Sequence, residues 1–185
     1  MKFAYADPPY LGLASFYAHL HPQALDYDRI ETHAALIARL SDEFPDGWAL
    51  SLHSPSLRAI LPLCPEDVRV MSWVKPFCSF KPGVGVAYAW EPVIVRGGRR
   101  RTRDQRTVRD WVAANITLRR GFTGAKPDDV CVWLFKVLGM EAEDEFHDLF
   151  PGSGAVSRAW ESYQIGLRQA SRPEQFELSG MTVTA

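Results

Sequence analysis

The residues best suited to chemistry stand near the start of the chain, in the tetrapeptide Asp7-Pro8-Pro9-Tyr10. Residues 2–6 before it are aromatic and apolar, which predicts a short buried strand. The two prolines end that strand and fix φ at two successive residues. A carboxylate, a rigid backbone carbonyl and an aromatic ring therefore share one inflexible turn. In open α/β sheets ligands bind at the carboxyl ends of strands, so this turn is the first candidate site.

A second candidate site lies in the last third of the chain. Residues 146–150 are expected to form a strand, Pro151-Gly152-Ser153-Gly154 a tight turn, and the residues from Ala155 a helix. Glycines let the backbone pass close to a ligand, and the first turn of a helix offers unpaired amides to its polar groups. The pattern predicts a ligand-binding loop.

A third feature is a basic stretch between residues 96 and 110, which holds seven arginines and only two acidic residues, Asp104 and Asp110. Planar guanidinium groups can bind two phosphate oxygens at once. A solvated helix face is the alternative explanation for any run of charge. The scarcity of acid favours nucleic-acid contact. The candidate contact residues are Arg99, Arg100, Arg101, Arg103 and Arg106.

The segments between these features must position them. Helices are expected at 29–44, 56–61 and 128–138, and strands at 48–52 and 68–74. This alternation predicts an α/β fold whose parallel sheet has right-handed crossovers. Residues 86–90 and 91–96 are close together and include Pro92, which predicts a hairpin at a sheet edge.

Composition narrows the class of protein. The 185 residues fit a single domain, 1–185, and the net charge of −1 gives no global attraction to nucleic acid. The three cysteines form no CxxC pair and no cluster with histidine, which favours reduced thiols and argues against a metal site. Without an apolar run of membrane-spanning length or a signal peptide, we expect a cytoplasmic protein that does not enter a membrane.

Three segments resemble motifs of one enzyme family. Asp7-Pro8-Pro9-Tyr10 resembles the catalytic motif of amino methyltransferases, in the form commonest among adenine-N6 enzymes. Residues 148–154 resemble the family's Asp-Pro-Phe-x-Gly-Ser-Gly cofactor loop, and Lys126-Pro127 resembles the segment that holds the methionine end of the cofactor. Their order is the permuted one of the beta-type DNA amino methyltransferases. The resemblance covers nearly all of residues 2–170.

The resemblance implies a fold and a reaction. The fold would be a Rossmann-like class I methyltransferase sheet, mostly parallel with an antiparallel edge strand, with helices on both faces, and reduced in size. Residues 96–124 would be a short basic insertion or recognition region. The reaction would be transfer of a methyl group from S-adenosylmethionine to the exocyclic N6 amine of adenine in DNA. It would need no metal.

The resemblance also implies residue roles. Asp7 and the Pro8 carbonyl would accept the two hydrogens of the amine, beside Pro9 in the same turn, and Tyr10 would stack on the flipped base. The cofactor would bind through seven residues: Lys126, Pro127, Asp148, Phe150, Gly152, Ser153 and Gly154.

The chain departs from the family in two places. Leu149 stands where the family loop has proline, and only about thirty residues follow the loop, where the family has two more strands. The sheet edge beside the cofactor would then be open. Residues 172–185, a second copy of the chain or a partner subunit would cover it. Cytosine-N4 methylation, RNA methylation and a catalytically reduced binding subunit stay open as alternatives.

Overall fold

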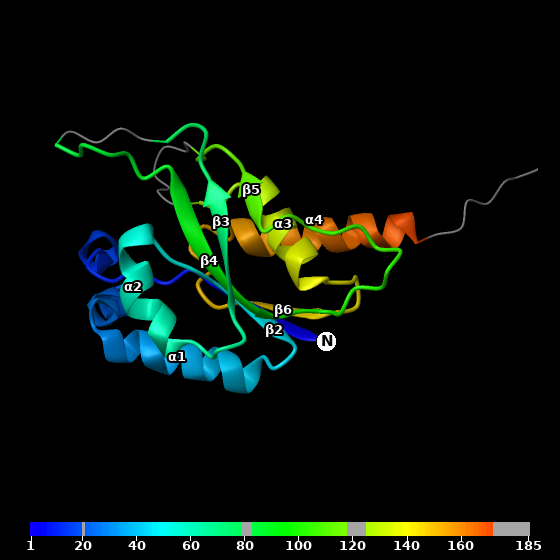
Figure 1. The fold of residues 1–185 in the computed structure, drawn as a ribbon, viewed down its shortest axis with the longest axis horizontal. Coiled ribbons are helices and arrows are strands. Elements are labelled where there is room, and N and C mark those ends of the chain that lie inside the picture. The colour runs from blue at the N-terminus through cyan, green and yellow to red at the C-terminus, as the bar shows by residue number, and fades with distance from the viewer. Residues whose placement is uncertain (20, 79–82, 118–124, 172–185) are drawn as a thin grey trace, which may run out of the picture.

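The computed structural model describes residues 1–19, 21–78, 83–117 and 125–171. Six strands form one sheet: β1 (Lys2–Ala6), β2 (Gly47–Ser51), β3 (Arg69–Val74), β4 (Trp90–Gly97), β5 (Trp111–Ala113) and β6 (Glu145–Asp148). Their order across the sheet is β5-β3-β4-β2-β1-β6. β4 runs antiparallel to both of its neighbours, and the other pairs are parallel. Figure 1 shows the sheet in the middle of the molecule.

Helices cover both faces of the sheet (Figure 1). The α-helices are α1 (Ile30–Glu43), α2 (Leu57–Ile60), α3 (Asp128–Leu138) and α4 (Ala155–Ala170). Short 3-10 helices lie in the connections, at Ala14–Tyr17, Pro22–Asp28, Ser54–Ser56 and Leu61–Leu63. α1 and α2 pack on one face, and α3 and α4 on the other.

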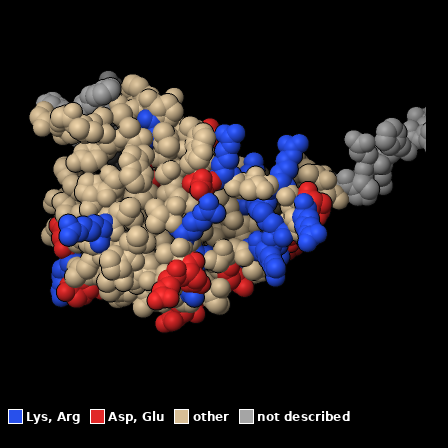
Figure 2. Space-filling model, viewed as in Figure 1, with Lys and Arg blue, Asp and Glu red and all other residues tan. Residues whose placement is uncertain are grey.

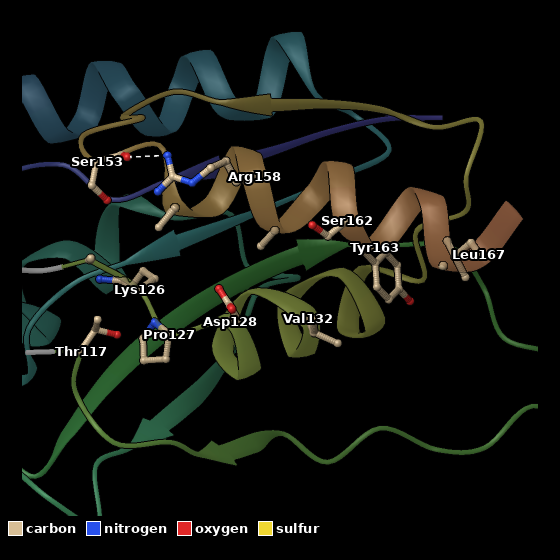
Figure 3. A pocket seen from close by; sticks show the side chains of 14 residues that line it. Thr117, Lys126, Pro127, Asp128, Val132, Ser153, Arg158, Ser162, Tyr163 and Leu167 are labelled. Carbon is tan, nitrogen blue, oxygen red and sulfur yellow. Dashed lines mark hydrogen bonds between the residues drawn. The ribbon is translucent and has the colours of Figure 1, made fainter. Parts of the chain in front are cut away.

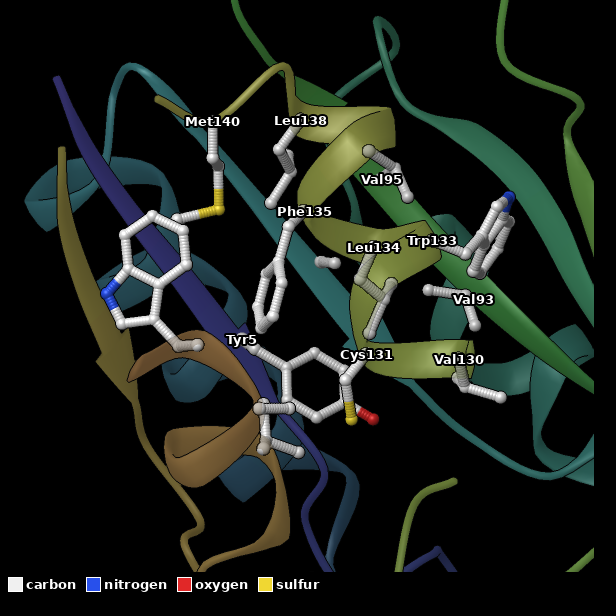
Figure 4. Close-up of a cluster of buried hydrophobic side chains, with 14 of the residues drawn as sticks. Tyr5, Val93, Val95, Val130, Cys131, Trp133, Leu134, Phe135, Leu138 and Met140 are labelled. Carbon is white, nitrogen blue, oxygen red and sulfur yellow. The ribbon is translucent and has the colours of Figure 1, made fainter. Parts of the chain in front are cut away.

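The two faces follow from the alternation of side chains along each strand. In β1, Phe3 and Tyr5 point into the core beneath α3 and α4, whereas Ala4 and Ala6 point toward α1 and α2. Figure 4 shows the first of these cores, in which Phe135 of α3 is fully buried. Removing such a side chain costs about 3–5 kcal/mol, so this core fixes α3 on the sheet.

The main sequence predictions for the fold are confirmed. The helices at 29–44 and 128–138 form as α1 and α3, and the strands after residue 1, at 48–52 and at 68–74 form as β1, β2 and β3. Gly139 ends α3 in the left-handed conformation, at φ 67°. The sheet is mostly parallel and contains one antiparallel strand, as expected.

The predicted hairpin at the sheet edge is wrong. Residues 90–97 form the single strand β4, which lies inside the sheet between β2 and β3. Pro92 was the reason to expect an edge, because it cannot donate a ladder hydrogen bond. Its carbonyl instead accepts a hydrogen bond from the amide of Leu52, which follows the last residue of β2. Pro92 therefore lacks its amide hydrogen at a position where the hydrogen-bond ladder between β2 and β4 has already ended.

Two further expectations concern the ends of the fold. Among the described residues β6 pairs only with β1, so it is the last strand of the sheet on that side. Residues 172–185, expected to help cover it, lie outside the described residues. No helix in the described ranges is both long enough and apolar enough to cross a membrane.

Candidate active site

The catalytic turn predicted from the sequence lies at the carboxyl end of β1. β1 and β2 are parallel, so the residues after Ser51 meet the turn at the same edge of the sheet. β4 runs the other way, which brings its first residues, including Glu91, to this edge as well. Lys126 arrives from the chain just before α3. This carboxyl edge therefore gathers polar side chains from four separate segments.

Five side chains at this edge form one network. The Lys126 ammonium lies 2.9 Å from Asp7 Oδ1, 2.8 Å from Asp7 Oδ2 and 3.4 Å from Glu91 Oε2. The Tyr10 hydroxyl lies 3.1 Å from both Asp7 Oδ1 and Glu91 Oε2. Lys75 donates to the other oxygen of Glu91. Asp7 and Glu91 are thus joined through Lys126 and Tyr10.

Burial makes the charges in this network interdependent. Burial alone would disfavour the Lys126 ammonium, but the neighbouring Asp7 raises the pKa of Lys126 well above its usual value. Burial also works against the Glu91 carboxylate, yet Lys126 and Lys75 lower the pKa of Glu91. Burial and then Asp7 raise the pKa of the Tyr10 phenol. At neutral pH the Glu91 carboxylate therefore faces the Lys126 ammonium, and the Tyr10 hydroxyl keeps its proton.

The ring of Tyr10 has a neighbour of its own. It stacks on the imidazole of His53, with ring centroids 5.4 Å apart and planes 9° from parallel. Burial lowers the pKa of His53, which favours a neutral imidazole in this stack. One face of the Tyr10 ring is thus covered by protein, so the predicted stacking on a base concerns the other face.

Pro8 and Pro9 complete the turn. Pro8 is buried and Pro9 is half-buried. The Pro8 carbonyl accepts no hydrogen bond from the described residues, whereas Asp7 already accepts from Lys126 and Tyr10. The turn therefore presents one free backbone acceptor beside one carboxylate that is partly engaged.

The glycine loop after β6 forms as the sequence predicts. Gly152 and Gly154 adopt positive φ angles of 46° and 72°, and Gly154 is the N-cap of α4. A Cβ at Gly152 would meet only the Phe150 carbonyl, at 3.8 Å, so the space in front of this glycine is open. A ligand can therefore approach the backbone closely here.

The other predicted cofactor residues of this loop differ in their surroundings. Asp148 accepts hydrogen bonds from the Ser157 hydroxyl at 3.0 Å and the Phe150 amide at 3.4 Å, and burial raises its pKa. The ring of Phe150 packs edge-on against Tyr27, on the α1 side of the sheet. Asp148 thus stands at the base of the loop, and Phe150 turns toward α1.

A cavity of about 900 Å³ lies between the first turns of α3 and most of the length of α4 (Figure 3). Three of the predicted cofactor residues, Lys126, Pro127 and Ser153, line it. Arg158 of α4 lines it too and donates a hydrogen bond to the Ser153 carbonyl at 2.9 Å. Arg158 was not among the site residues predicted from the sequence. The charged residues that line the cavity are thus two cations, Lys126 and Arg158, and one carboxylate, Asp128.

The predicted nucleic-acid residues lie elsewhere. β4 ends at Gly97 beside the first residue of β2, and Arg99 then donates to the Gly139 carbonyl and to both oxygens of Asp144. Arg101 donates to the carbonyls of Arg106 and of Lys136, near the end of α3. These contacts place the segment at the amino edge of the sheet, opposite the catalytic turn.

The surface agrees with this placement. In Figure 2 lysines and arginines gather on the right of the view, where the chain after β4 runs in Figure 1. Arg100, Arg103 and Arg106 are exposed and form no ion pair with the described residues. β1 spans five residues at about 3.3 Å each, so roughly 16 Å of sheet separates the two edges. Residues 118–124 of the predicted recognition region lie outside the described residues.

Two residues of the network were not predicted from the sequence. The sequence predicted the elements around Glu91 and Lys75 but no role for either side chain. A usable signal was present, because Glu91 is an acidic residue at the start of the apolar run Pro92–Val95. Charged residues are rarely buried unless they are paired. No group of three or more metal-ligating side chains occurs in the described part of the chain.

Comparison with known proteins identifies the fold. No protein-family model and no curated protein sequence matches the chain. Two crystal structures of M1.HpyAVI do match. The complex with SAM has a TM-score of 0.58 at 14% identity, over 88% of this chain and 78% of that one. M1.HpyAVI alone has a TM-score of 0.52 at 14% identity, over 88% and 76%. The chain thus has the Rossmann-like methyltransferase fold that its motifs led us to expect.

Proposed function

We propose that this chain transfers a methyl group from S-adenosylmethionine to the exocyclic N6 amine of adenine in DNA. The observation that carries the proposal is the meeting, at one edge of a methyltransferase fold, of the Asp7–Tyr10 turn, Lys126 and the glycine loop. The neighbouring structures are of DNA methyltransferases, one of them in complex with SAM. Fold alone does not determine function, so the weight rests on the residues of the site.

The residues around the cavity fit the cofactor. Lys126 would bind the carboxylate of its methionine part, together with the amides at the start of α4. Asp148 would accept hydrogen bonds from its amino group, and Gly152 leaves room for close approach. When bound, the cofactor supplies an electrophilic methyl group. The remaining work of the protein is to place and activate the amine.

An exocyclic adenine amine is a poor nucleophile, because its lone pair is delocalised into the ring. Asp7 and the free carbonyl of Pro8 would accept its two hydrogens, which makes the lone pair available for in-line attack on the methyl group. In a duplex the base must first leave the stack, and the exposed face of Tyr10 would then receive it. This assigns the partly engaged carboxylate and the free carbonyl of the turn to one substrate group.

The experiment is methyl transfer from S-adenosylmethionine with a labelled methyl group to DNA, to RNA and to no nucleic acid. We expect label in DNA, recovered as N6-methyladenine after digestion to nucleosides. Label recovered as N4-methylcytosine, or only in RNA, would replace the substrate in the proposal. Binding of cofactor and DNA without any transfer would instead favour a binding subunit.

A further inference from the structure

Glu91 is a carboxylate that the proposed chemistry leaves without a role. It is the second residue of β4, and its side chain is only 14% exposed. It contacts three polar groups, the Tyr10 hydroxyl and the ammonium groups of Lys75 and Lys126. Burying a charged group to this extent costs free energy unless the group is paired with hydrogen-bond donors or opposite charges.

The network around Glu91 is balanced in charge. Asp7 and Glu91 are negative, Lys126 and Lys75 are positive, and the Tyr10 hydroxyl bridges the two carboxylates. Lys126 is shared unequally, since its ammonium lies 2.8 Å from Asp7 and 3.4 Å from Glu91. Asp7 is the group that must accept an amine hydrogen. The more tightly Lys126 binds Asp7, the weaker Asp7 becomes as an acceptor for the amine.

We infer that Glu91 is a positioning residue for methyl transfer, which holds Lys126 and Tyr10 so that the Asp7 carboxylate stays available to the amine. This inference rests on the proposed function. Glu91 supplies Lys126 with a second carboxylate partner. The Lys75 ammonium, which pairs with Glu91, weakens the attraction of Glu91 for Lys126. The two residues therefore act on Asp7 in opposite directions, although neither contacts it.

This opposition leads to a charge-balance experiment on the full-length protein. Glu91→Gln keeps the shape but leaves Asp7 as the one carboxylate partner of Lys126 among the described residues, and leaves the Lys75 ammonium without its carboxylate. We expect kcat to fall roughly 10- to 100-fold, as for loss of a hydrogen bond to a charged group, while KM for the cofactor changes little. Lys75→Met then removes one of the two ammonium groups and restores neutrality. We expect kcat of the double variant to return to within roughly fivefold of wild type.

The double variant separates positioning from simple structural support. If Glu91 only stabilised the fold, a second buried substitution would add to the damage, and the double variant would be slower and less stable than Glu91→Gln. That result, or a kcat for folded Glu91→Gln within twofold of wild type, overturns the inference. Circular dichroism and thermal unfolding of each variant confirm that folded proteins are compared.

A second measurement does not depend on turnover. The ammonium signal of Lys126 in NMR spectra of 15N-lysine-labelled protein can be assigned by its loss in Lys126→Met. We expect the signal to shift in Glu91→Gln and to move back toward its wild-type position in the double variant. An unmoved signal in Glu91→Gln overturns the inference even if methyl transfer is observed. If wild type methylates no nucleic acid, the proposed function fails, and this signal alone decides whether Glu91 holds Lys126.

Discussion

Each edge of the sheet carries a partly buried cluster of charge, yet the two clusters differ in how their carboxylates are held. At the amino edge, Asp144 accepts two hydrogen bonds from Arg99 and one from the amide of Glu141, and its side chain is 3% exposed. At the carboxyl edge, Asp7 shares its donors, Lys126 and Tyr10, with Glu91, and its side chain is 21% exposed.

This difference separates an ion cluster whose carboxylate is fully engaged from one whose carboxylate can still accept a hydrogen bond from a ligand. Asp144 is closed off, because its buried oxygens already accept hydrogen bonds from Arg99, the Glu141 amide and the N-terminal ammonium, which tie the segment after β4 to the turn between α3 and β6. Asp7 is partly exposed, and its donors Lys126 and Tyr10 can also donate hydrogen bonds to Glu91. A carboxylate that must bind a substrate needs both properties. The number of charges alone would not have separated the two edges.

The largest effect should come from removing the charge of each carboxylate in turn. Asp7→Asn should lower methyl transfer roughly 10²- to 10⁴-fold, because the amine loses its charged acceptor. Asp144→Asn is the matched control at the other edge, and should leave kcat within a few-fold of wild type while lowering the free energy of unfolding by about 1–3 kcal/mol. Labelled-cofactor assays and denaturant unfolding measure the two quantities. Similar losses of kcat in both variants would erase the distinction between the edges.

A smaller effect is expected at Tyr10, where the ring and the hydroxyl can be separated. Tyr10→Phe removes the donor shared by Asp7 and Glu91 but keeps the ring on His53. Tyr10→Ala also removes the predicted stack on the base, worth about 1–3 kcal/mol. DNA affinity should therefore fall further in Tyr10→Ala than in Tyr10→Phe, with cofactor affinity nearly equal in both. Equal loss of cofactor affinity in Tyr10→Ala would show that the ring faces the cofactor.

Much of the fold was predictable because its signals are local. The apolar run before Asp7 and the spacing of apolar residues over 128–138 each predict one element without reference to the rest of the chain. The turn and the glycine loop were predictable for a related reason, since proline and glycine restrict or free the backbone where they stand. The two halves of the site were thus found separately.

The network between the two halves was not predictable, because its contacts join distant parts of the chain. Glu91 meets Tyr10 across 81 residues and Lys126 across 35 residues. No local pattern encodes such a contact. Lys126 was expected at the cofactor, and the structure shows that its ammonium pairs with Asp7.

The position of the arginines follows from strand direction. Because β4 is antiparallel to β2, the chain that leaves it at Gly97 must emerge at the amino edge. The predicted edge hairpin at 86–96 did not imply that the chain after residue 97 emerges at the amino edge. Composition suggested a ligand for the arginines but could not say on which side of the molecule they stand.

The contrast between the edges also predicts how stability changes with pH. Burial would raise the pKa of Asp144, but the hydrogen bonds from Arg99 lower it below the ordinary value of 3.8. A lowered pKa in the folded state means that the contribution of Asp144 to stability is present above pH 3.8 and is lost as the pH falls through the lower, folded value.

The difference in unfolding free energy between wild type and Asp144→Asn should therefore be constant above pH 3.8 and shrink below it. Urea unfolding over a series of acidic buffers measures this difference. If this difference instead grows as the pH falls, Asp144 is not stabilised as an anion by its hydrogen-bond donors at the amino edge.

The smallest effect on turnover should come from the exposed arginines of the amino edge. Replacing Arg100, Arg103 and Arg106 by glutamine removes three positive charges beyond the edge of the sheet opposite Asp7, so kcat at saturating DNA should not change. If these side chains bind phosphates, the salt dependence of DNA affinity should flatten by about 0.9 log units for each lost contact. The matched control replaces Arg29, Arg39 and Arg58, which are equally exposed but lie on the α1 and α2 side of the sheet. The control should leave the slope unchanged, because net charge falls equally but on the other face of the sheet, where two of the three arginines pair with Glu31 and Glu43. An equal slope in wild type and both triple variants would mean that the amino edge does not touch DNA, and that the substrate is held by the carboxyl edge alone.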